Sequence, residues 1–450
     1  MFRAFANVFR IPDLRKKVLF TLMMLCVYRI GFYVPLPGAD QDRLRTHWGG
    51  GGASEAAQLF SMFTGGDLGQ STIFGLGIMP YISASIILQL LGTASVVPAL
   101  EKLQKEGEPG RRKINEYTRY LTVLLALIQA VFWVRYMNAN QLVMPDFRWS
   151  TAFFLVAIPA LTVGTLLLMW IGEQIDEYGI GNGVSLIIMA GIVCQLPSVF
   201  VDIYNGFGPT GQMNAGKVIF MIVSFVSVVA GAILITQAQR RIPIQQAKQL
   251  RGRRVVGGAR HYLPLRINQG GVMPIIFASS FLFFPTMLFG WLESIAWPTA
   301  VWRFLNDAFR PGEYFYTLSY VLMVFFFAYF WGSVTFQPKE IANNLRDSGS
   351  FIPGLRPGKR TADYLESVNT RITYVGAGFL ALIAVIPSVV AVYLRIPFGI
   401  SAFLGGTGLL IVVSVALDLI HRLEANLIMR NYEGFLGGEG GGAARVKGRQ

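Results

Sequence analysis

The chain alternates between long apolar stretches and shorter polar ones, and this pattern predicts its architecture. A hydrocarbon core of roughly 30 Å needs about 20 helical residues at 1.5 Å each. Ten apolar runs come near this length, at 18–37, 73–92, 117–137, 152–171, 184–201, 217–236, 272–292, 314–335, 372–393 and 402–421. Several contain Pro or Gly, which membrane helices tolerate when neighbouring helices satisfy the freed backbone groups. We therefore expect an all-α polytopic membrane protein with ten transmembrane helices.

Composition supports this expectation and argues against several classes of enzyme. Of the 450 residues, 53% are apolar and only 14% are charged, whereas soluble proteins average about 25% charged residues. Cys26 and Cys194 lie inside apolar runs, so neither a disulfide framework nor a metal site is indicated, and His47, His261 and His421 lack ligand spacing. No G-x-x-x-x-G-K-[ST] string occurs. We expect no catalytic residues, no cofactor and an external source of energy.

The basic residues predict how the chain is oriented. Arg15, Lys16 and Lys17 precede the first apolar run as in a signal peptide, but no small-residue cleavage site follows, so we interpret this run as an uncleaved first span. The net charge is +14, and 30 of the 39 Lys and Arg residues fall on one side: in the N-terminus, the tail from residue 422, and the loops 97–119, 237–271 and 336–371. Because cytoplasmic loops carry an excess of Lys and Arg, an even number of spans with both termini cytoplasmic is expected.

The 237–271 loop is long and contains eight Lys and Arg residues with no acidic residue. One interpretation is that these charges only orient the chain in the membrane and attract anionic lipid headgroups, at about 1 kcal/mol per charge. The other is a docking surface for an anionic partner, such as ribosomal RNA or an acidic protein face. The residue pattern leaves both open.

Residues 60–77 are moderately apolar, broken by Gly and too short to span a membrane. Non-helical backbone at membrane depth is tolerated only where protein or a water-filled cavity covers it. The segment is therefore either an ordinary extracytoplasmic loop or a re-entrant segment that lines a cavity.

The middle of the apolar runs is nearly free of charge. Arg29 lies toward the outer end of the first run, where it could snorkel, and Asp418 and His421 lie at the inner end of the last. Ion-coupled carriers place titratable groups in mid-membrane, so a proton-coupled carrier is not expected. A carrier driven by its substrate gradient stays open, and so does a scaffold that gathers membrane partners.

Other positions in and beside the runs carry weaker signals. Ile78 and Ile82 lie one helical turn apart, as do Val184 and Ile188, which taken alone is ordinary for packing or lipid-facing residues. Three amides are more informative, because an amide in hydrocarbon seeks a hydrogen-bond partner on another helix: Gln89, Gln129 and Asn268.

Several strings resemble the SecY family of bacterial protein-export channels. They are GIMPYISASIILQLL at 77–91, EGEPGRRK at 106–113, GEQI at 172–175, GIGNG at 179–183, GVMPIIFASS at 271–280, ANNL at 342–345, SG at 348–349 and FIPGLRPG at 351–358. The resemblance runs from about residue 15 to about residue 435, in the family's order. The Gly-rich tail after Leu436 departs from it.

The resemblance implies an hourglass channel of two pseudo-symmetric five-helix halves, which passes unfolded secretory polypeptides and releases hydrophobic segments sideways into lipid. The halves would be residues 1–201 and 217–421, with a short re-entrant plug helix at about 60–73. The loops 237–271 and 336–371 and the tail 422–450 would be cytoplasmic. The implied location is the bacterial inner (plasma) membrane.

The resemblance also implies roles for individual residues. The central pore ring would be Ile78, Ile82, Val184, Ile188, Ile276 and Ile411, although the position of Val184 is more usually Ile. The plug would include Phe60, Phe63, Thr64, Gly65, Gly66 and Asp67. Gln89, Gln129 and Asn268 would form a polar cluster across the lateral gate, where the second and third helices face the seventh and eighth.

The implied partners lie on the cytoplasmic side and in the membrane. The motor ATPase SecA and the ribosome would contact Arg356, Arg240, Arg241, Arg251, Arg253, Arg254 and Tyr432. The small subunits SecE and SecG, signal sequences, nascent polypeptides and membrane lipid complete the set.

Overall fold

The computed structural model describes most of the chain. The described residues are 11–49, 64–66, 71–93, 97–206, 214–246, 249–251, 254–256, 260–271, 273–295, 299–310, 312–394, 396, 400–401, 403 and 407–436. Most of them are helical. The helices are α2 (Pro12–Gly31), α3 (Gln41–Gly49), α5 (Met79–Thr93), α6 (Pro98–Lys105), α7 (Glu108–Ala139), the short 3-10 helix η1 (Pro145–Phe147), α8 (Thr151–Tyr178), α9 (Gly183–Asn205), α10 (Ala215–Gln237), α11 (Met273–Ile295), α12 (Thr299–Ala308), α13 (Tyr314–Thr335), α14 (Pro338–Asp347), α15 (Lys359–Tyr393) and α17 (Thr407–Leu436).

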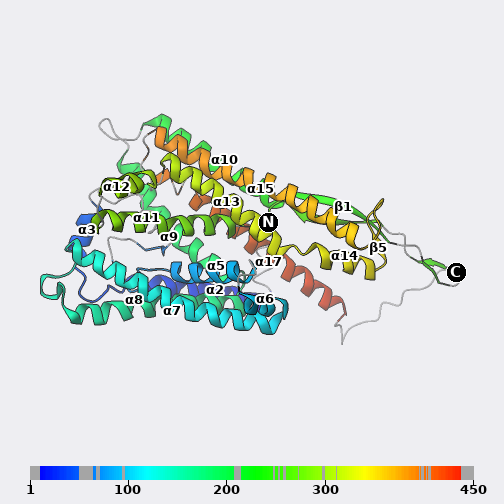
Figure 1. Cartoon of the computed structure of the whole chain (residues 1–450), viewed down its shortest axis with the longest axis horizontal. Coiled ribbons are helices and arrows are strands. Elements are labelled where there is room, and N and C mark those ends of the chain that lie inside the picture. Colours follow the sequence, from blue (N-terminus) through cyan, green and yellow to red (C-terminus); the bar gives the residue numbers. More distant parts are fainter. Residues whose placement is uncertain are drawn as a thin grey trace.

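The long helices form two groups that run along the long axis of the molecule (Figure 1). In one group α5 packs on α7, α7 on α8, and α8 on α2. In the other α11 packs on α13, α13 on α15, and α15 on α10. α9 packs on α8 of the first group, and α17 packs on α10 of the second. The groups meet at two seams, one where α5 contacts α11 and one where α9 contacts α17.

Each of the ten apolar runs overlaps a helix, but two helices differ in ways that matter. The first run was expected to continue to residue 37, whereas α2 ends at Gly31 and Pro35 pairs with Thr72 in a β-bridge. The second run was expected to begin at 73, whereas α5 begins at Met79. Residues 73–78 form turns, and Gly77 has a φ of 58°, a conformation that favours Gly.

Among the described residues, six helices are long and apolar enough to cross a membrane: α7, α8, α9, α10, α13 and α15. By the same measure α5 and α11 contain shorter apolar helices, Met79–Gly92 and Met273–Leu282. The chain is thus a multi-pass membrane protein by length and composition of its helices, and the number ten stays a prediction.

The expected tail at 422–450 is not separate from the last span. The last apolar run ends at 421, but α17 continues without interruption to Leu436. The first part of this tail is therefore a helical extension beyond the bundle.

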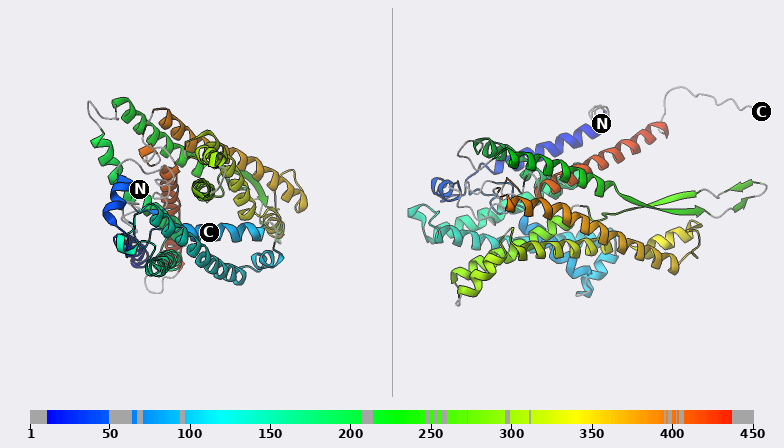
Figure 2. Two further views of the ribbon diagram at one scale, coloured as in Figure 1. Left: turned by 60° about the vertical axis from the view of Figure 1, so that its left-hand side comes forward. Right: turned by 90° about the horizontal axis from the view of Figure 1, so that it is seen from above.

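The strands belong to the two long loops. β1 (Gln239–Gln246) pairs antiparallel with β4 (Arg260–Arg266), and a short hairpin joins β2 (Gln249–Arg251) to β3 (Arg254–Val256). The strand β5 (Ser350–Phe351) adds to the other edge of β1, in the order β4-β1-β5. This ribbon projects beyond the ends of the neighbouring helices (Figure 2). The loops 237–271 and 336–371 therefore share one sheet.

The turn segment before α5 lies closely against α8. A Cβ added at Gly164 on α8 would overlap the carbonyl oxygen of Ile73, whereas one added at Gly172 on the same helix would meet Val184 at an ordinary 3.5 Å. Close helix–backbone approach of this kind requires a residue without a side chain.

We expect Gly164→Ala to lower the free energy of unfolding by about 1–3 kcal/mol, because the added methyl must push residues 73–78 away from α8. The thermal unfolding midpoint of the purified protein in detergent measures the effect. Gly172→Ala is the matched control and should leave the midpoint unchanged or slightly higher, since Ala favours the helix over Gly. Equal midpoints for the two variants would contradict the close packing.

Candidate functional site

The six residues expected to form the pore ring come together in one hydrophobic cluster. They belong to four helices or their starts: Ile78 and Ile82 to α5, Val184 and Ile188 to α9, Ile276 to α11, and Ile411 to α17. All except Val184, which is half-buried, are at most 3% exposed. Residues more than 300 positions apart in the sequence therefore belong to the same cluster.

Local geometry aims these side chains inward. Ile82 donates its backbone N–H to the Ile78 carbonyl at 3.1 Å, so the two side chains lie on the same face one turn apart. Val184 and Ile188 have the same spacing at the start of α9. A cluster of branched aliphatic side chains excludes water and offers no polar group to a passing ion. The arrangement has the chemistry of a seal, and the specific ring stays a prediction.

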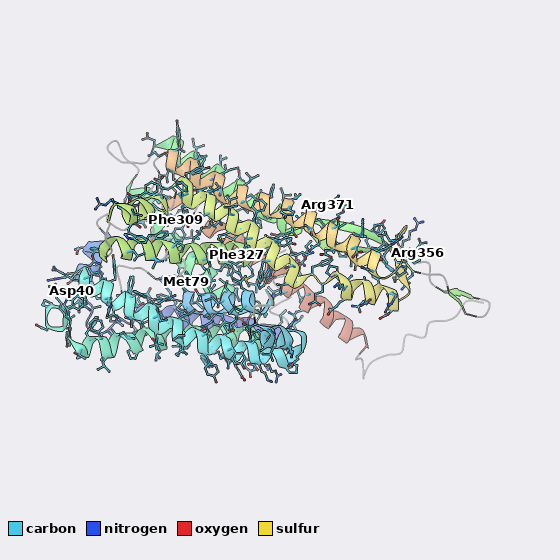
Figure 3. All side chains as sticks on the ribbon, viewed as in Figure 1. Asp40, Met79, Phe309, Phe327, Arg356 and Arg371 are labelled. Atoms are coloured by element: carbon cyan, nitrogen blue, oxygen red, sulfur yellow. The ribbon has the colours of Figure 1, made fainter. Side chains whose placement is uncertain are left out.

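One seam crosses directly beside this cluster. Ser280 on α11 is fully buried, and its hydroxyl lies 3.9 Å from the Met79 sulfur on α5. Figure 3 shows Met79 in the middle of the molecule, between Asp40 near one end and Arg356 near the other. The Ser280–Met79 contact at this seam is thus weakly polar, and a contact of this kind contributes little free energy.

Two of the three amides expected at the lateral gate make local hydrogen bonds. The Gln89 side-chain amide donates to the Ser85 hydroxyl at 3.1 Å within α5, and the Asn268 amide donates to the Gly271 carbonyl at 2.8 Å in the turn before α11. Gln129 is half-buried on α7. These bonds do not join the three amides to one another, so a polar cluster across the gate stays a prediction.

The expected plug lies partly outside the described residues. Phe60, Phe63 and Asp67 fall outside them, whereas Thr64, Gly65 and Gly66 are placed. Thr64 is 3% exposed, and the carbonyls of residues 64–66 accept hydrogen bonds from side chains of α2 and α9. The part of the segment that is described is therefore buried within the helix bundle.

Residues 71–73 are also held inside the bundle. The carbonyl of Ser71 accepts the backbone N–H of Leu36 at 2.9 Å, and Ile73 donates its N–H to the Val34 carbonyl at 3.2 Å. Ser71 and Thr72 are each 3% exposed. An ordinary exposed loop would leave these groups to water, so the re-entrant interpretation fits the described part better.

Sequence reasoning treated Arg29 as a snorkelling residue, and the structure directs it inward instead. Its guanidinium donates to the Gly65 carbonyl at 3.2 Å and lies 5.6 Å from the centre of the Tyr33 ring. Gln195 on α9, which the sequence analysis did not single out, donates to the Gly66 carbonyl at 3.4 Å. The available signal was a polar residue inside an apolar run.

The basic residues of the 237–271 loop lie on the projecting ribbon. Alternate residues of β1 and β4 face inward, and three of them are buried: Ile242, Ile244 and Leu265. The outward face carries three exposed arginines and an exposed tyrosine: Arg241, Arg260, Arg266 and Tyr262. Arg240, at the start of β1, is exposed as well.

Two prolines determine how this ribbon can be approached. Pro243 pairs with Tyr262, and Pro264 with Arg241. A proline has no N–H to donate, so it fits a β-ladder only where its nitrogen faces away from the partner strand. On that side, each of the two prolines removes a backbone donor that an added strand would need. A partner is therefore expected to bind the side chains of the ribbon and not to extend its sheet.

The remaining contact residues are placed to different degrees. Arg356 is exposed in the turn between β5 and α15, at the ribbon's end of the molecule (Figure 3). Its carbonyl accepts the Thr361 hydroxyl at 2.9 Å, which fixes the turn. Arg251 pairs with Arg254 in the register of the β2–β3 hairpin, and Tyr432 lies on α17. Arg253 lies outside the described residues.

A small core unites the loops 237–271 and 336–371 and was not anticipated. It joins Ile242 and Leu265 of the ribbon to Phe336, Ile352 and Leu365 around α14, β5 and α15. Because Gln245 pairs with Phe351 and Gln246 with Ser350, the turn with Arg356 and the basic ribbon form one unit.

Among the described residues, no group of three His, Cys, Asp or Glu side chains could hold a metal ion. The features that the structure does bring together are an aliphatic centre, a buried segment beside it, a weakly polar seam and a basic projection.

Comparison with known proteins assigns these features to a family. The SecY family model matches residues 72–420. The chain is 41% identical over 447 residues to "Protein translocase subunit SecY" of Thermotoga maritima, with 97% of this chain and 98% of that protein covered. It is 43% identical over 454 residues to the protein of the same name from Streptomyces galbus, with 97% and 100% covered.

Solved structures show the same fold at lower identity. "The structure of a protein conducting channel" aligns with a TM-score of 0.63 at 19% identity, covering 92% of this chain and 93% of the other. The structure described as "Sec61 in the Canine ribosome-channel complex from the endoplasmic reticulum" aligns at 0.60 and 18%, with the same coverage. A third, whose title says that the plug domain of SecY stabilises the closed state and maintains a membrane seal, aligns at 0.59 and 18%, covering 92% of each chain.

The family model and the near-complete alignment with curated relatives, on a fold shared with protein-conducting channels, show that this chain belongs to the SecY family.

Proposed function

We propose that this protein is the central subunit of a protein-conducting channel, which passes unfolded secretory polypeptides across the membrane and releases hydrophobic segments into lipid. The observation that carries the proposal is the aliphatic cluster at the junction of the two helix groups, in a chain whose curated relatives are protein translocase subunits. In this role the chain is a conduit and not an enzyme.

The proposal includes ten spans in two halves of five, with both termini in the cytoplasm of a bacterium. Six helices already satisfy the length and composition of a span. The basic ribbon lies at the end of the molecule that carries Arg356 and Arg371 (Figure 3), which supports a cytoplasmic position for this end, because Lys and Arg concentrate there.

A channel for polypeptide must admit many different side chains and still hold back ions. Aliphatic side chains meet both needs, because an empty aliphatic constriction sheds its water and makes no specific bonds to a passing chain. Ile78, Ile82, Val184, Ile188, Ile276 and Ile411 would form this ring. The segment at about 60–73 would close it from the extracytoplasmic side.

Lateral release follows from transfer energies. A central Leu, Ile, Phe or Val gains about 0.3 to 0.6 kcal/mol in lipid, so ten such residues gain several kcal/mol and polar stretches gain nothing. The seam where α5 meets α11 would open for such segments. Its Met79–Ser280 contact supports the proposal, since weakly polar contacts cost little to separate.

The partners of the channel would be SecE and SecG in the membrane, and SecA or the ribosome on the cytoplasmic side. The basic outward face of the ribbon and the exposed Arg356 support a contact with an anionic partner. One of the solved structures with this fold is a ribosome–channel complex by its title, which supports the ribosome as one such partner.

The direct test is translocation in a purified system. Proteoliposomes that contain this chain with SecE and SecG should protect a secretory precursor from added protease when SecA and ATP are present. The same vesicles should not accumulate the folded, ligand-stabilised form of the precursor, because the ring admits only an unfolded chain. Absence of protected precursor in an assembled, correctly oriented complex would contradict the proposed function.

We expect Ile82→Asn with Ile188→Asn to raise the resting ion conductance of the channel in planar bilayers by at least tenfold. Amide side chains hydrate the constriction that the aliphatic groups keep dry. Ile171→Asn, which places the same change in the same cluster on α8, serves as the control. Conductance that rises equally in the control would contradict the assignment of the ring.

We expect Arg356→Glu to abolish SecA-driven translocation while the complex still assembles and its thermal midpoint stays unchanged, because the side chain is exposed and the reversed charge repels an acidic face. Protease protection of the precursor measures the effect. Arg346→Glu, an equally exposed change on α14, should retain most of the activity. Normal translocation by Arg356→Glu would rule out the motor contact.

A further inference from the structure

Three side chains bind three successive backbone carbonyls of the 64–66 stretch. The Tyr28 hydroxyl donates to the Thr64 carbonyl at 3.3 Å, and the Arg29 guanidinium donates to the Gly65 carbonyl at 3.2 Å. The Gln195 amide donates to the Gly66 carbonyl at 3.4 Å. Tyr28 and Arg29 belong to α2 and Gln195 to α9. We call these three side chains the clasp.

The stretch also lies directly on the backbone of α9. A Cβ added at Gly191 would lie 2.7 Å from the Gly65 Cα, and one added at Gly65 would lie 2.5 Å from the Gly191 Cα. Gly65 also has a φ of 75°, so both the close approach and the backbone conformation require glycine at this position. Only a glycine pair allows this approach, and a single methyl group on α9 would act as a wedge.

The three donors differ in strength. Hydrogen bonds from ionised donors are roughly twice as strong as neutral ones, so Arg29 contributes most. All three distances lie at or beyond the long end of the usual range for hydrogen bonds, so each bond separates readily. Among the described residues, these long hydrogen bonds and a close approach to α9 hold the stretch, so it is fixed in place but can be released.

Arg29 has a second contact that persists when the stretch leaves. Its guanidinium lies 5.6 Å from the centre of the Tyr33 ring, on the same helix α2. A guanidinium over an aromatic face is stabilised by cation–π attraction. Loss of the Gly65 carbonyl therefore does not leave the charge without a contact, and this lowers the cost of release.

We infer that the clasp holds residues 64–66 against α9 and sets how often this stretch leaves its seat, with Arg29 as the principal positioning residue. The consequence for the channel rests on the proposed function, in which the segment around these residues closes the pore. A Cβ added at Gly77 would lie 2.8 Å from the Thr64 Cα, so the stretch lies against the turn directly before Ile78, and its release is coupled to the aliphatic cluster through this contact.

The seating of the stretch can be measured without any transport. With Cys26 and Cys194 replaced by Ser, Thr64→Cys places a single thiol at a site that is 3% exposed. A water-soluble maleimide then reports, on the full chain in nanodiscs, how often this site opens. Arg29→Gln should raise the labelling rate about tenfold, which corresponds to about 1.4 kcal/mol, and Gln195→Leu should raise it less.

Three variants separate the clasp from a general loss of packing. Arg29→Lys keeps the charge and a donor and should restore much of the slow labelling. Arg43→Gln removes another arginine that donates to a backbone carbonyl, that of Gln141 at 3.3 Å, and should label at the parent rate. Gly191→Ala keeps all three donor side chains, but its methyl would lie 2.7 Å from the Gly65 Cα and 2.9 Å from the Tyr28 hydroxyl, so it should accelerate labelling by displacing Gly65 and the Tyr28 donor together.

Each outcome decides the inference. Labelling at the parent rate in both Arg29→Gln and Gly191→Ala, with both proteins folded by their thermal midpoints, overturns it. Faster labelling in these two but not in Arg43→Gln supports it. Bilayer conductance then tests the proposed function separately: if the stretch opens faster and conductance stays at the parent level, the clasp stands and the sealing role of the segment fails.

Discussion

Burial of branched aliphatic side chains at the junction of two helix groups is the interaction on which the rest of this structure depends. α5, α9, α11 and α17 each contribute to the central cluster, and α5 and α9 do so with side chains one turn apart. Its apolar character lets the two groups touch without being locked together, because dispersion contacts have no preferred partner.

The contacts around this centre differ in the ease with which they separate. The seam between α5 and α11 includes a buried serine against a methionine sulfur, whereas α9 and α17 pack on the other seam. The 64–66 stretch is held by long hydrogen bonds and a glycine–glycine approach. A molecule that opens toward lipid and along its axis needs weak contacts of this kind, set between helices that stay intact.

The basic ribbon is an exposed, charged surface that is supported by a core of its own. Its inward face and the segments around β5 share a small apolar core, so the outward basic face and the Arg356 turn are held in a constant relation. Pro243 and Pro264 leave gaps in its backbone donors, which protects a projecting edge from unwanted strand addition. The exposed arginines supply the charge of this surface, and the sheet supports them rigidly.

The sequence by itself determined the apolar runs, their overlap with helices and the side on which the basic residues gather, because these depend on the length and composition of local segments. The family was also evident from strings such as GIMPYISASI at 77–86. Only the tertiary structure decided that Ile78 and Ile411 belong to one hydrophobic cluster, that two loops share one sheet, and that Arg29 turns inward to the Gly65 carbonyl. Each of these is a contact between residues far apart along the chain. No periodicity or local composition encodes such a contact, since it arises only when whole helices pack.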